Sequence, residues 1–275
     1  MGKTVEHIDI VTAGAVTPEK IRACLEAIGR ADPLIVPPRS GSMIGQYRIA
    51  CIEDQVVGIG SLYHRAGKAE IDVRVRPEFR RKGVGSALFD VLTADIRTAL
   101  HAGCDGAQRG AQAFLERRDF TLTGVLFAQR WDGAPEDVPP AFSSVQLQAT
   151  RDYELTQNVL GKAYADSWFM PAIGAEDFDR DDINTWLAYR DGIPVGAAVA
   201  RRSDDTVWIA GLGSLPTERR LGVGRAMLCQ IMSLAAEENC GVVLLTPAED
   251  EQSLRWTRKL GFWSYRSWSQ YMRVI

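Results

Sequence analysis

Residues 77–88 read PEFRRKGVGSAL, and residues 216–227 read PTERRLGVGRAM. Both stretches fit the pattern P-x-x-R-R-x-G-V-G-x-A-[L/M], which is too long to recur by chance in one chain. Each follows a run that predicts a strand, at residues 69–75 and 206–215, and each precedes apolar residues at helical spacing. The sequence therefore predicts a strand, a basic glycine loop and a helix twice.

A glycine loop at the start of a helix is suited to binding an anion. Glycine lets backbone N–H groups turn toward a ligand, and the helix N-terminus adds a partial positive charge. The arginine pair in each loop, Arg80-Arg81 and Arg219-Arg220, favours a doubly charged group such as a pyrophosphate. A dinucleotide-binding fold fits less well because both loops lack its third glycine, and the nucleotide motif G-x-x-x-x-G-K-[S/T] is absent.

The loop pattern R-x-x-G-x-G between a strand and a helix resembles the acyl-CoA pyrophosphate loop of the GNAT superfamily of N-acyltransferases. The family's later K-x-G-F signature is present in the second half as Lys259, Gly261 and Phe262. In the first half, Asp119 stands where the glycine belongs, before Phe120. The resemblance covers nearly all of the chain and implies two tandem GNAT domains of α/β class, each with an α+β mixed sheet.

The spacing of the repeats predicts the domain organisation. Arg219 follows Arg80 by 139 positions, and Phe262 follows Phe120 by 142, which indicates a duplicated domain rather than a short-period solenoid. The proline-rich stretch WDGAPEDVPP begins at Trp131 and is typical of a linker. We therefore expect an N-terminal GNAT-like domain at 1–131, a linker at 132–143 and a C-terminal GNAT domain at 144–275.

Further elements follow from periodicity and turn residues. They comprise helices that begin near residues 18 and 152, hairpins at 47–63 and 186–200, a strand at 97–101, a glycine-rich turn at 103–110, and a last strand at 265–274.

Composition and charge exclude several classes of protein. The net charge of -3 argues against a general nucleic-acid binder. Five cysteines without metal-ligand spacing and three histidines predict no metal site and fit a reducing cytoplasm. No apolar run approaches the roughly 20 residues of a membrane span, and the first residues are too polar for a signal peptide. We expect a cytoplasmic protein without membrane or nucleic-acid partners.

The resemblance implies that acetyl-CoA or another acyl-CoA is the co-substrate. In the family, the pyrophosphate contacts the glycine loop, and a backbone N–H on the preceding strand stabilises the oxyanion. The matching positions in the second half are Leu212, Gly213, Ser214, Arg219, Arg220, Leu221, Gly222, Val223, Gly224 and Arg225. Those in the first half are Val73, Val75, Arg80, Arg81, Lys82, Gly83, Val84, Gly85 and Ser86.

Catalytic groups follow less directly from the motifs. Acyl transfer from a thioester to an amine needs a base, an oxyanion donor and a proton for the leaving thiolate. The tyrosine that often supplies this proton in the family is replaced by Thr257 and Leu115. The candidates are Ser214 as oxyanion donor, Tyr265 as a phenol, and Glu70 as a base only if the first half is active. Glu70 alternates with apolar neighbours, so a solvated strand face remains an open alternative.

We expect the second half to be catalytic because its K-x-G-F signature is intact and its variable segment is longer. The acidic run at 176–182 is either a solvated loop or a border of the acceptor pocket, where Trp168, Phe169 and Trp186 would supply flat contact area. The first half would then be a structural partner or a second acyl-CoA site.

The expected activity is transfer of acetyl from acetyl-CoA to the amine of a small metabolite by direct attack, without a covalent enzyme intermediate. Two alternatives remain open. One is a biosynthetic acyltransferase with a non-acetyl acyl-CoA or an acyl carrier protein as donor, and the other is a module that binds acyl-CoA without turnover.

Overall fold

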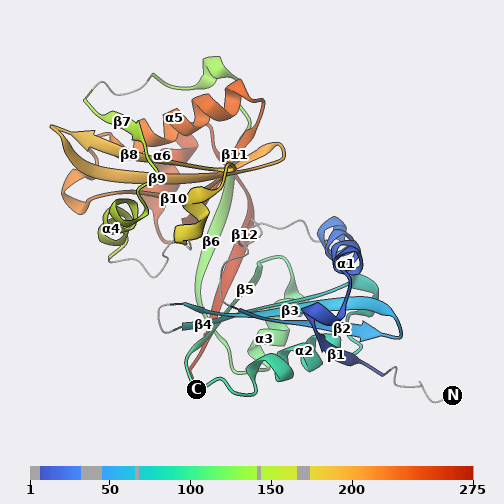
Figure 1. Ribbon diagram of the computed structural model, residues 1–275. Coiled ribbons are helices and arrows are strands. Elements are labelled where there is room, and N and C mark those ends of the chain that lie inside the picture. Colours follow the sequence, from blue (N-terminus) through green and yellow to red (C-terminus); the bar gives the residue numbers. More distant parts are fainter. Residues whose placement is uncertain (1–6, 32–44, 66–67, 141–143, 166–173, 275) are drawn as a thin grey trace. The chain divides into compact units, whose positions relative to one another are not determined.

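The computed structural model describes residues 7–31, 45–65, 68–140, 144–165 and 174–274 (Figure 1). Contacts divide the chain into two compact units. The first unit contains Met1–Gly124 and Trp268–Ile275, and the second contains Val125–Ser267.

The described residues of the first unit form a mixed sheet. Its order is β1 (Asp9–Thr12), β2 (Gly45–Ile52), β3 (Gln55–Arg65), β4 (Lys68–Val75), β5 (Leu100–Asp105), and the end of β12 (Trp263–Arg273). Neighbours are antiparallel except β4 and β5, which run parallel. The helical elements are η1 (Ala13–Ala15), α1 (Pro18–Ala31), η2 (Pro77–Phe79), α2 (Val84–Thr93) and α3 (Arg109–Glu116).

Helices cover both faces of this sheet, with α1 on one side and α2 and α3 on the other (Figure 1). Helix α2 approaches β3 so closely that a Cβ on Gly60 would lie 2.6 Å from Leu92 Cδ1. On the opposite face, Cys24 and Ile28 of α1 pack against Ile49 and Val56. The alternation of side chains along the strands thus feeds two separate apolar layers.

The second unit repeats this plan. Its sheet order is β6 (Thr121–Trp131, from Val125 onward), β11 (Gly241–Pro247), β10 (Thr206–Ser214), β9 (Ile193–Ser203), β8 (Ile183–Arg190) and β7 (Gln146–Ala149). Strands β10 and β11 are the parallel pair. The helical elements are η3 (Pro135–Asp137), α4 (Tyr153–Ala163), η4 (Ala175–Asp179), η5 (Pro216–Glu218), α5 (Val223–Glu237) and α6 (Glu251–Lys259). Met227, Leu228 and Ile231 of α5 lie at the centre of the larger core cluster.

Each unit is completed by a strand from the other half of the sequence. Leu126 to Trp131 of β6 pair antiparallel with β11 inside the second unit. Trp268 to Arg273 of β12 pair antiparallel with β5 inside the first unit, where Tyr271 is buried. The boundary between the units is therefore not a single point in the linker expected at 132–143. Most of β6 belongs to the second unit, and the end of β12 belongs to the first.

Local expectations agree with the elements at most positions, with one clear difference. The strand expected at 97–101 spans Leu100–Asp105, and it includes Gly103, which we expected in a turn. A Cβ on Gly103 would lie 2.4 Å from Trp268 Nε1, so glycine is needed there for close packing rather than for a turn. Much of the expected loop at 31–45 and residues 166–171 lie outside the described residues. Within the described ranges, no helix has the length and apolar character to cross a membrane.

Candidate functional site

The two glycine loops have the same backbone shape. Gly83 and Gly222 are the N-cap residues of α2 and α5, with φ angles of 88° and 86°. Two residues earlier, Arg81 and Arg220 have φ angles of 64° and 67°. This left-handed region favours glycine and is sterically costly for arginine. A shape retained in both copies despite this cost indicates a functional loop.

Each loop offers backbone donors to an anion. The first bonds of the helices run from Ala87 N to Gly83 O at 3.0 Å and from Ala226 N to Gly222 O at 2.9 Å. The N–H groups before these positions have no partner within the helix. Neither N-cap has a side-chain hydrogen bond. Successive N–H groups in such a turn form a concave anion site, and the helix dipole adds to it.

The buried valines and the glycines of the loops serve through their backbones. The side chains of Val84 and Val223 are 1% exposed and pack in the two cores. A Cβ on Gly85 would lie 3.6 Å from the Phe114 ring, and one on Gly224 would lie 3.9 Å from Trp256. The start of each loop helix therefore lies beside an aromatic side chain, Phe114 of α3 in the first unit and Trp256 of α6 in the second.

Side chains differ between the loops. In the first, Arg80 Nε donates to the carbonyl of Val75 at 3.0 Å, and Lys82 Nζ lies 5.0 Å from the Phe79 ring centroid. In the second, Leu221 stands at the position of Lys82 and is 51% exposed. At this position only the first loop carries a positive charge.

The first loop also has a partner that the motifs did not reveal. Arg118 Nη2 donates to Ser86 Oγ at 2.8 Å, and its guanidinium lies 3.8 Å from the Phe114 ring centroid. Burial lowers the pKa of Arg118 from its ordinary value, but the group stays cationic near neutral pH. In the second half, Arg225 replaces Ser86 and Leu260 replaces Arg118. Each half therefore has one arginine associated with this loop position. In the first half it is Arg118, which donates to Ser86 from outside the loop, and in the second half it is Arg225, which belongs to the loop pattern itself.

Arg190 at the end of β8 braces the second loop. Its Nη1 pairs with the Glu218 carboxylate, and its Nη2 donates to the Leu221 carbonyl at 2.8 Å. Sequence analysis missed Arg190 because it belongs to a distant hairpin with no motif of its own.

In both units the strand before the loop separates from its parallel neighbour. The pairs between β4 and β5 end at Ile71 and Ala102, and those between β10 and β11 end at Trp208 and Val243. On its opposite edge, β4 stays paired with β3 as far as Val75, and β10 likewise stays paired with β9 as far as Ser214. Beyond these points, one edge of β4 and one edge of β10 have no strand partner among the described residues.

Hydrogen bonds identify which backbone groups face the open edges. Ala69 N donates to Ala99 O on the β5 side at 3.2 Å, whereas Arg76 N donates to Val57 O on the β3 side at 2.9 Å. The N–H and C=O groups of successive residues in a strand point to opposite edges, so those of Val73 and Val75 face the open edge of β4. Leu215 N donates to Val195 O on the β9 side, so the same alternation directs Leu212 and Ser214 to the open edge of β10.

In the second unit, the end of α4 engages these groups. The Tyr164 hydroxyl donates to Leu212 O at 2.8 Å and accepts from Leu212 N at 3.3 Å. Burial raises the pKa of Tyr164, which keeps the phenol protonated. Arg219 Nη2 donates to Ala163 O at 2.9 Å, and a Cβ on Gly213 would lie 2.7 Å from Ala163 Cβ. Helix α4 is therefore packed tightly against β10.

In the first unit, the corresponding face has a pocket of about 370 Å³ between α1 and the strands. Glu70, Asp72 and Arg74 of β4 line it. Asp72 accepts from Arg74, with Nη2 to Oδ2 at 2.6 Å. Gly103 of β5 also lines the pocket, which therefore reaches the point where β4 and β5 separate.

Tyr265 has other neighbours than the second loop. Its ring meets Trp263 edge-on at 5.7 Å between centroids. Burial raises its pKa, and the nearby Arg130 partly opposes this effect. Among the interactions given for the described residues, none connects Tyr265 with Ser214, so a catalytic role for Tyr265 stays a prediction.

The described part of the acidic run is largely structural. Asp182 bonds Arg180 at 2.8 Å and Arg201 at 2.9 Å, and these bonds, led by Arg180, lower its pKa to about 2. Phe178 is buried in the core beside α4. Trp168 and Phe169 lie outside the described residues.

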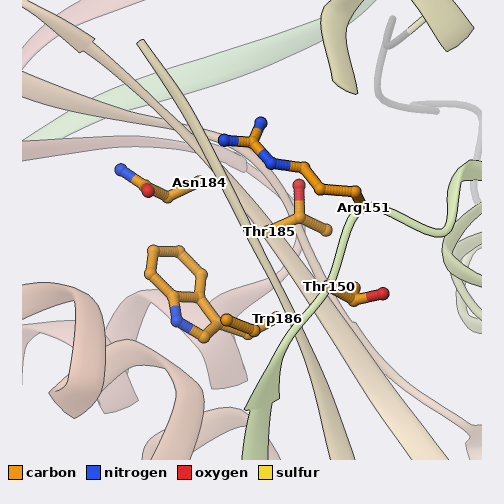
Figure 2. Close-up of a pocket in the computed structure, with 6 residues that line it drawn as sticks. Thr150, Arg151, Asn184, Thr185 and Trp186 are labelled. Carbon is orange, nitrogen blue, oxygen red and sulfur yellow. The ribbon is translucent and has the colours of Figure 1, made fainter. Parts of the chain in front are cut away.

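The second unit has a pocket of about 240 Å³, and Figure 2 shows side chains that line it. The residues that line it are Ala149, Thr150, Arg151, Asn184, Thr185 and Trp186. None of these described residues has a carboxylate or a thiol side chain. Arg151 Nη1 donates to three carbonyls of the segment 178–183, the shortest bond being 2.7 Å to Phe178 O. Trp186 is a buried core residue, 9% exposed.

Two mixed sheets, each opening beside a basic glycine loop at a helix N-terminus, define a tandem α/β architecture with two candidate anion sites. The model of the "Acetyltransferase (GNAT) family" matches residues 26–120 and 150–262. Since these regions cover well over half of the sequence, the chain belongs to the GNAT acetyltransferase family.

Solved structures share the tandem architecture along the whole chain. A GCN5-related N-acetyltransferase from Sphaerobacter thermophilus is 15% identical, with a TM-score of 0.72, covering 97% of this chain and 95% of that one. A tandem GNAT protein from the clavulanic acid biosynthesis pathway, solved without AcCoA, is 16% identical, with a TM-score of 0.74 and 98% coverage of both chains. A putative acetyltransferase from Pyrococcus horikoshii is 13% identical, with a TM-score of 0.68, covering 98% and 89%. At these identities the likeness concerns the fold. No curated protein matches the sequence significantly.

Proposed function

We propose that this protein transfers an acetyl group from acetyl-CoA to the amine of a small metabolite, and that transfer takes place in the first unit. The observation that carries the proposal is the pocket lined by Glu70, which reaches the point where β4 and β5 separate. The sequence alone suggested the second unit. There, however, the end of α4 already bonds Leu212 and Arg219, which favours a structural role for that unit.

The first loop would hold the pyrophosphate. The N–H groups at the start of α2, from Gly83 to Ser86, would donate to its oxygens, and Arg80, Arg81 and Lys82 would add positive charge. Arg118 would act through Ser86 as a positioning residue. The acyl end of acetyl-CoA would then lie along the open edge of β4.

The open edge supplies the oxyanion donor. The N–H groups of Val73 and Val75 face it, and such a preorganised donor stabilises the tetrahedral intermediate most when water is excluded. An amine held in the pocket would attack the thioester carbon, forming the C–N bond and breaking the C–S bond. Of the two protons that the ammonium form loses, one would pass through the Glu70 carboxylate to solvent and one would end on the CoA sulfur.

Replacement of the base tests this assignment. Glu70→Gln should lower kcat by about 100-fold or more, because a positioned general base contributes 10²–10⁴-fold. The acetyl-CoA dissociation constant should not change. Glu116→Gln, on α3 outside the pocket, is the matched control. Free-thiol release across pH, with a panel of amines, measures both variants. Full activity of Glu70→Gln, or an equal loss in Glu116→Gln, would remove Glu70 from the mechanism.

A further inference from the structure

Two adjacent residues at the end of α4 engage both parts of the candidate acyl-CoA site in the second unit. The Tyr164 hydroxyl donates to Leu212 O at 2.8 Å and accepts from Leu212 N at 3.3 Å. The Ala163 carbonyl accepts from Arg219 Nη2 at 2.9 Å. Leu212 lies on β10, and Arg219 belongs to the glycine loop. One short segment therefore bonds the strand and the loop together.

The contact with Leu212 uses the same backbone groups that an extended ligand would use. An open strand edge offers an N–H donor and a C=O acceptor, and an amide of a ligand can pair with both. The hydroxyl of Tyr164 supplies the same two functions from a single oxygen, because a phenol both donates and accepts. The pantetheine arm of acyl-CoA contains amide groups. Tyr164 therefore takes the place of this arm on the edge of β10.

The fit between α4 and β10 leaves no room for a ligand at this point. A Cβ on Gly213 would lie 2.7 Å from Ala163 Cβ and 3.2 Å from Tyr164 Cε2. Only a glycine on the strand allows the end of α4 to approach so closely. A chain of ligand atoms cannot pass between them unless this segment moves away.

The first unit has no side chain at the corresponding helix position. Counted from the first residue of each helix, Gly29 of α1 stands at the place of Tyr164. A Cβ on Gly29 would meet no atom within 4 Å, and Gly29 lines the pocket beside β4. The position that closes the second unit is therefore a glycine beside an open space in the first.

We propose that Ala163 and Tyr164 form a plug that holds a second acyl-CoA site closed, and that acyl-CoA enters the second unit only in exchange for this plug. The inference goes beyond the proposed function, because transfer in the first unit does not depend on it. Acyl-CoA must replace three hydrogen bonds of the protein before it gains its own. The plug should therefore weaken binding in the second unit on the order of 10- to 1,000-fold.

A buried polar cluster indicates that the opened site binds without transfer. Thr257 replaces the expected proton donor and is 1% exposed. Its hydroxyl lies 3.0 Å from Gln129 Oε1 and 2.9 Å from Ser253 O, and Gln129 Oε1 also accepts from Thr246 at 2.8 Å. This hydroxyl is therefore bonded inside the core and has no path to a leaving thiolate.

Calorimetric titration of the full chain with acetyl-CoA, without an amine, tests the plug. We expect the wild type to bind one equivalent tightly and a second weakly. Tyr164→Phe keeps the ring but removes two of the three hydrogen bonds, so the second equivalent should bind about 5- to 100-fold more tightly. Two equally tight sites in the wild type, or an unchanged second site in Tyr164→Phe, would overturn the proposal.

Two further variants locate the effect. Tyr153→Phe makes the same change at the start of α4, where the ring packs edge-on against Phe178, and it should leave both equivalents unchanged. Adding Gly222→Asp to Tyr164→Phe should abolish the gained affinity, because the carboxylate repels the pyrophosphate. An equal gain in Tyr153→Phe, or a gain that survives Gly222→Asp, would refute a plug at the second loop.

Amide exchange of the unaltered protein is decisive if Tyr164→Phe fails to fold. The Tyr164 amide donates to Leu160 O at 2.9 Å, and it should lose protection at millimolar acetyl-CoA because the end of α4 leaves β10. The Leu155 amide at the start of the helix should keep its protection. Unchanged protection of the Tyr164 amide would overturn the proposal.

Thiol release with an amine panel separates the plug from the proposed function. If both hold, Tyr164→Phe gains the second equivalent and keeps the wild-type kcat. If kcat rises together with the second equivalent, transfer takes place in the second unit, so the proposed function fails and the plug stands. If turnover is normal and no variant gains a second equivalent, the plug fails and the function stands.

Discussion

Gly83→Asp and Gly222→Asp each place a carboxylate at the N-cap of a loop helix, one in each unit. Gly83→Ala and Gly222→Ala add the same Cβ without the charge. Comparison of the four variants separates backbone strain from electrostatic repulsion of the ligand. It also decides which unit performs the transfer.

The magnitudes follow from the geometry at Gly83. A Cβ there would meet only Ile8 Cδ1, at 3.9 Å, so alanine causes no clash. At a φ of 88° it should cost about 1–2 kcal/mol of folding free energy. A carboxylate about 6 Å from a phosphate charge repels it by about 3 kcal/mol at an effective dielectric constant near 20. This corresponds to roughly 100-fold weaker binding of acetyl-CoA.

Stability and binding should respond to the charge in opposite directions. A carboxylate at a helix N-terminus stabilises the helix by about 0.3–1 kcal/mol, so Gly83→Asp should unfold at a slightly higher temperature than Gly83→Ala. Its affinity for acetyl-CoA should nevertheless be much lower. A simple loss of folding cannot produce this combination.

Calorimetric titration, thermal unfolding and thiol release measure the three quantities. We expect Gly83→Asp to lose at least about 99% of turnover and Gly222→Asp to retain most of it, because the groups of the second site are already bonded to α4. The opposite ranking would refute the reasoning. It would place the transfer in the second unit, as the sequence alone suggested.

Three further predictions concern the fold. Tyr164→Phe should lower the free energy of unfolding by about 1–3 kcal/mol, because both backbone groups of Leu212 lose a buried partner; an unchanged urea midpoint would contradict this. The pKa of Asp182 falls from 3.8 to about 2 on folding, so its stabilising effect is present above about pH 4 and is lost as the pH falls toward 2. The urea midpoints of wild type and Asp182→Asn should therefore differ at pH 7 and converge near pH 2, whereas a constant difference would exclude the ion pairs as the cause. A chain ending at Ser267 should lose amide-exchange protection in β5 and keep it in β9, and retained protection in β5 would show that β12 is dispensable.

The sequence predicted the duplicated strand, loop and helix because these depend on local periodicity and on glycine at a left-handed φ. Gly83 and Gly222 have that conformation in both copies. The family membership predicted from the motifs is confirmed. The assignments of acyl-CoA contacts and catalytic residues stay predictions.

Several features depend on contacts that local patterns do not encode. Arg118 and Arg190 reach the loops from distant elements. The pairing of β12 with β5 joins residues about 165 positions apart, and an amphipathic strand does not specify its partner. The pocket forms between α1 and β4 in the first unit. In the second unit, the end of α4 packs closely against β10, where a Cβ on Gly213 would lie 2.7 Å from Ala163 Cβ.

The exchanged strands also order events during synthesis. Strand β5 is complete at Asp105, but the segment that pairs with it begins only at Trp268. At 5–20 residues per second, a ribosome needs on the order of 10–30 s to make the intervening residues. During that time the edge of β5 presents unpaired N–H and C=O groups, which invite pairing with another nascent chain. The first unit can therefore be completed only after residues 125–267 of the second unit have been synthesised, and the edge of β5 must be shielded until Trp268 to Arg273 are available to pair with it.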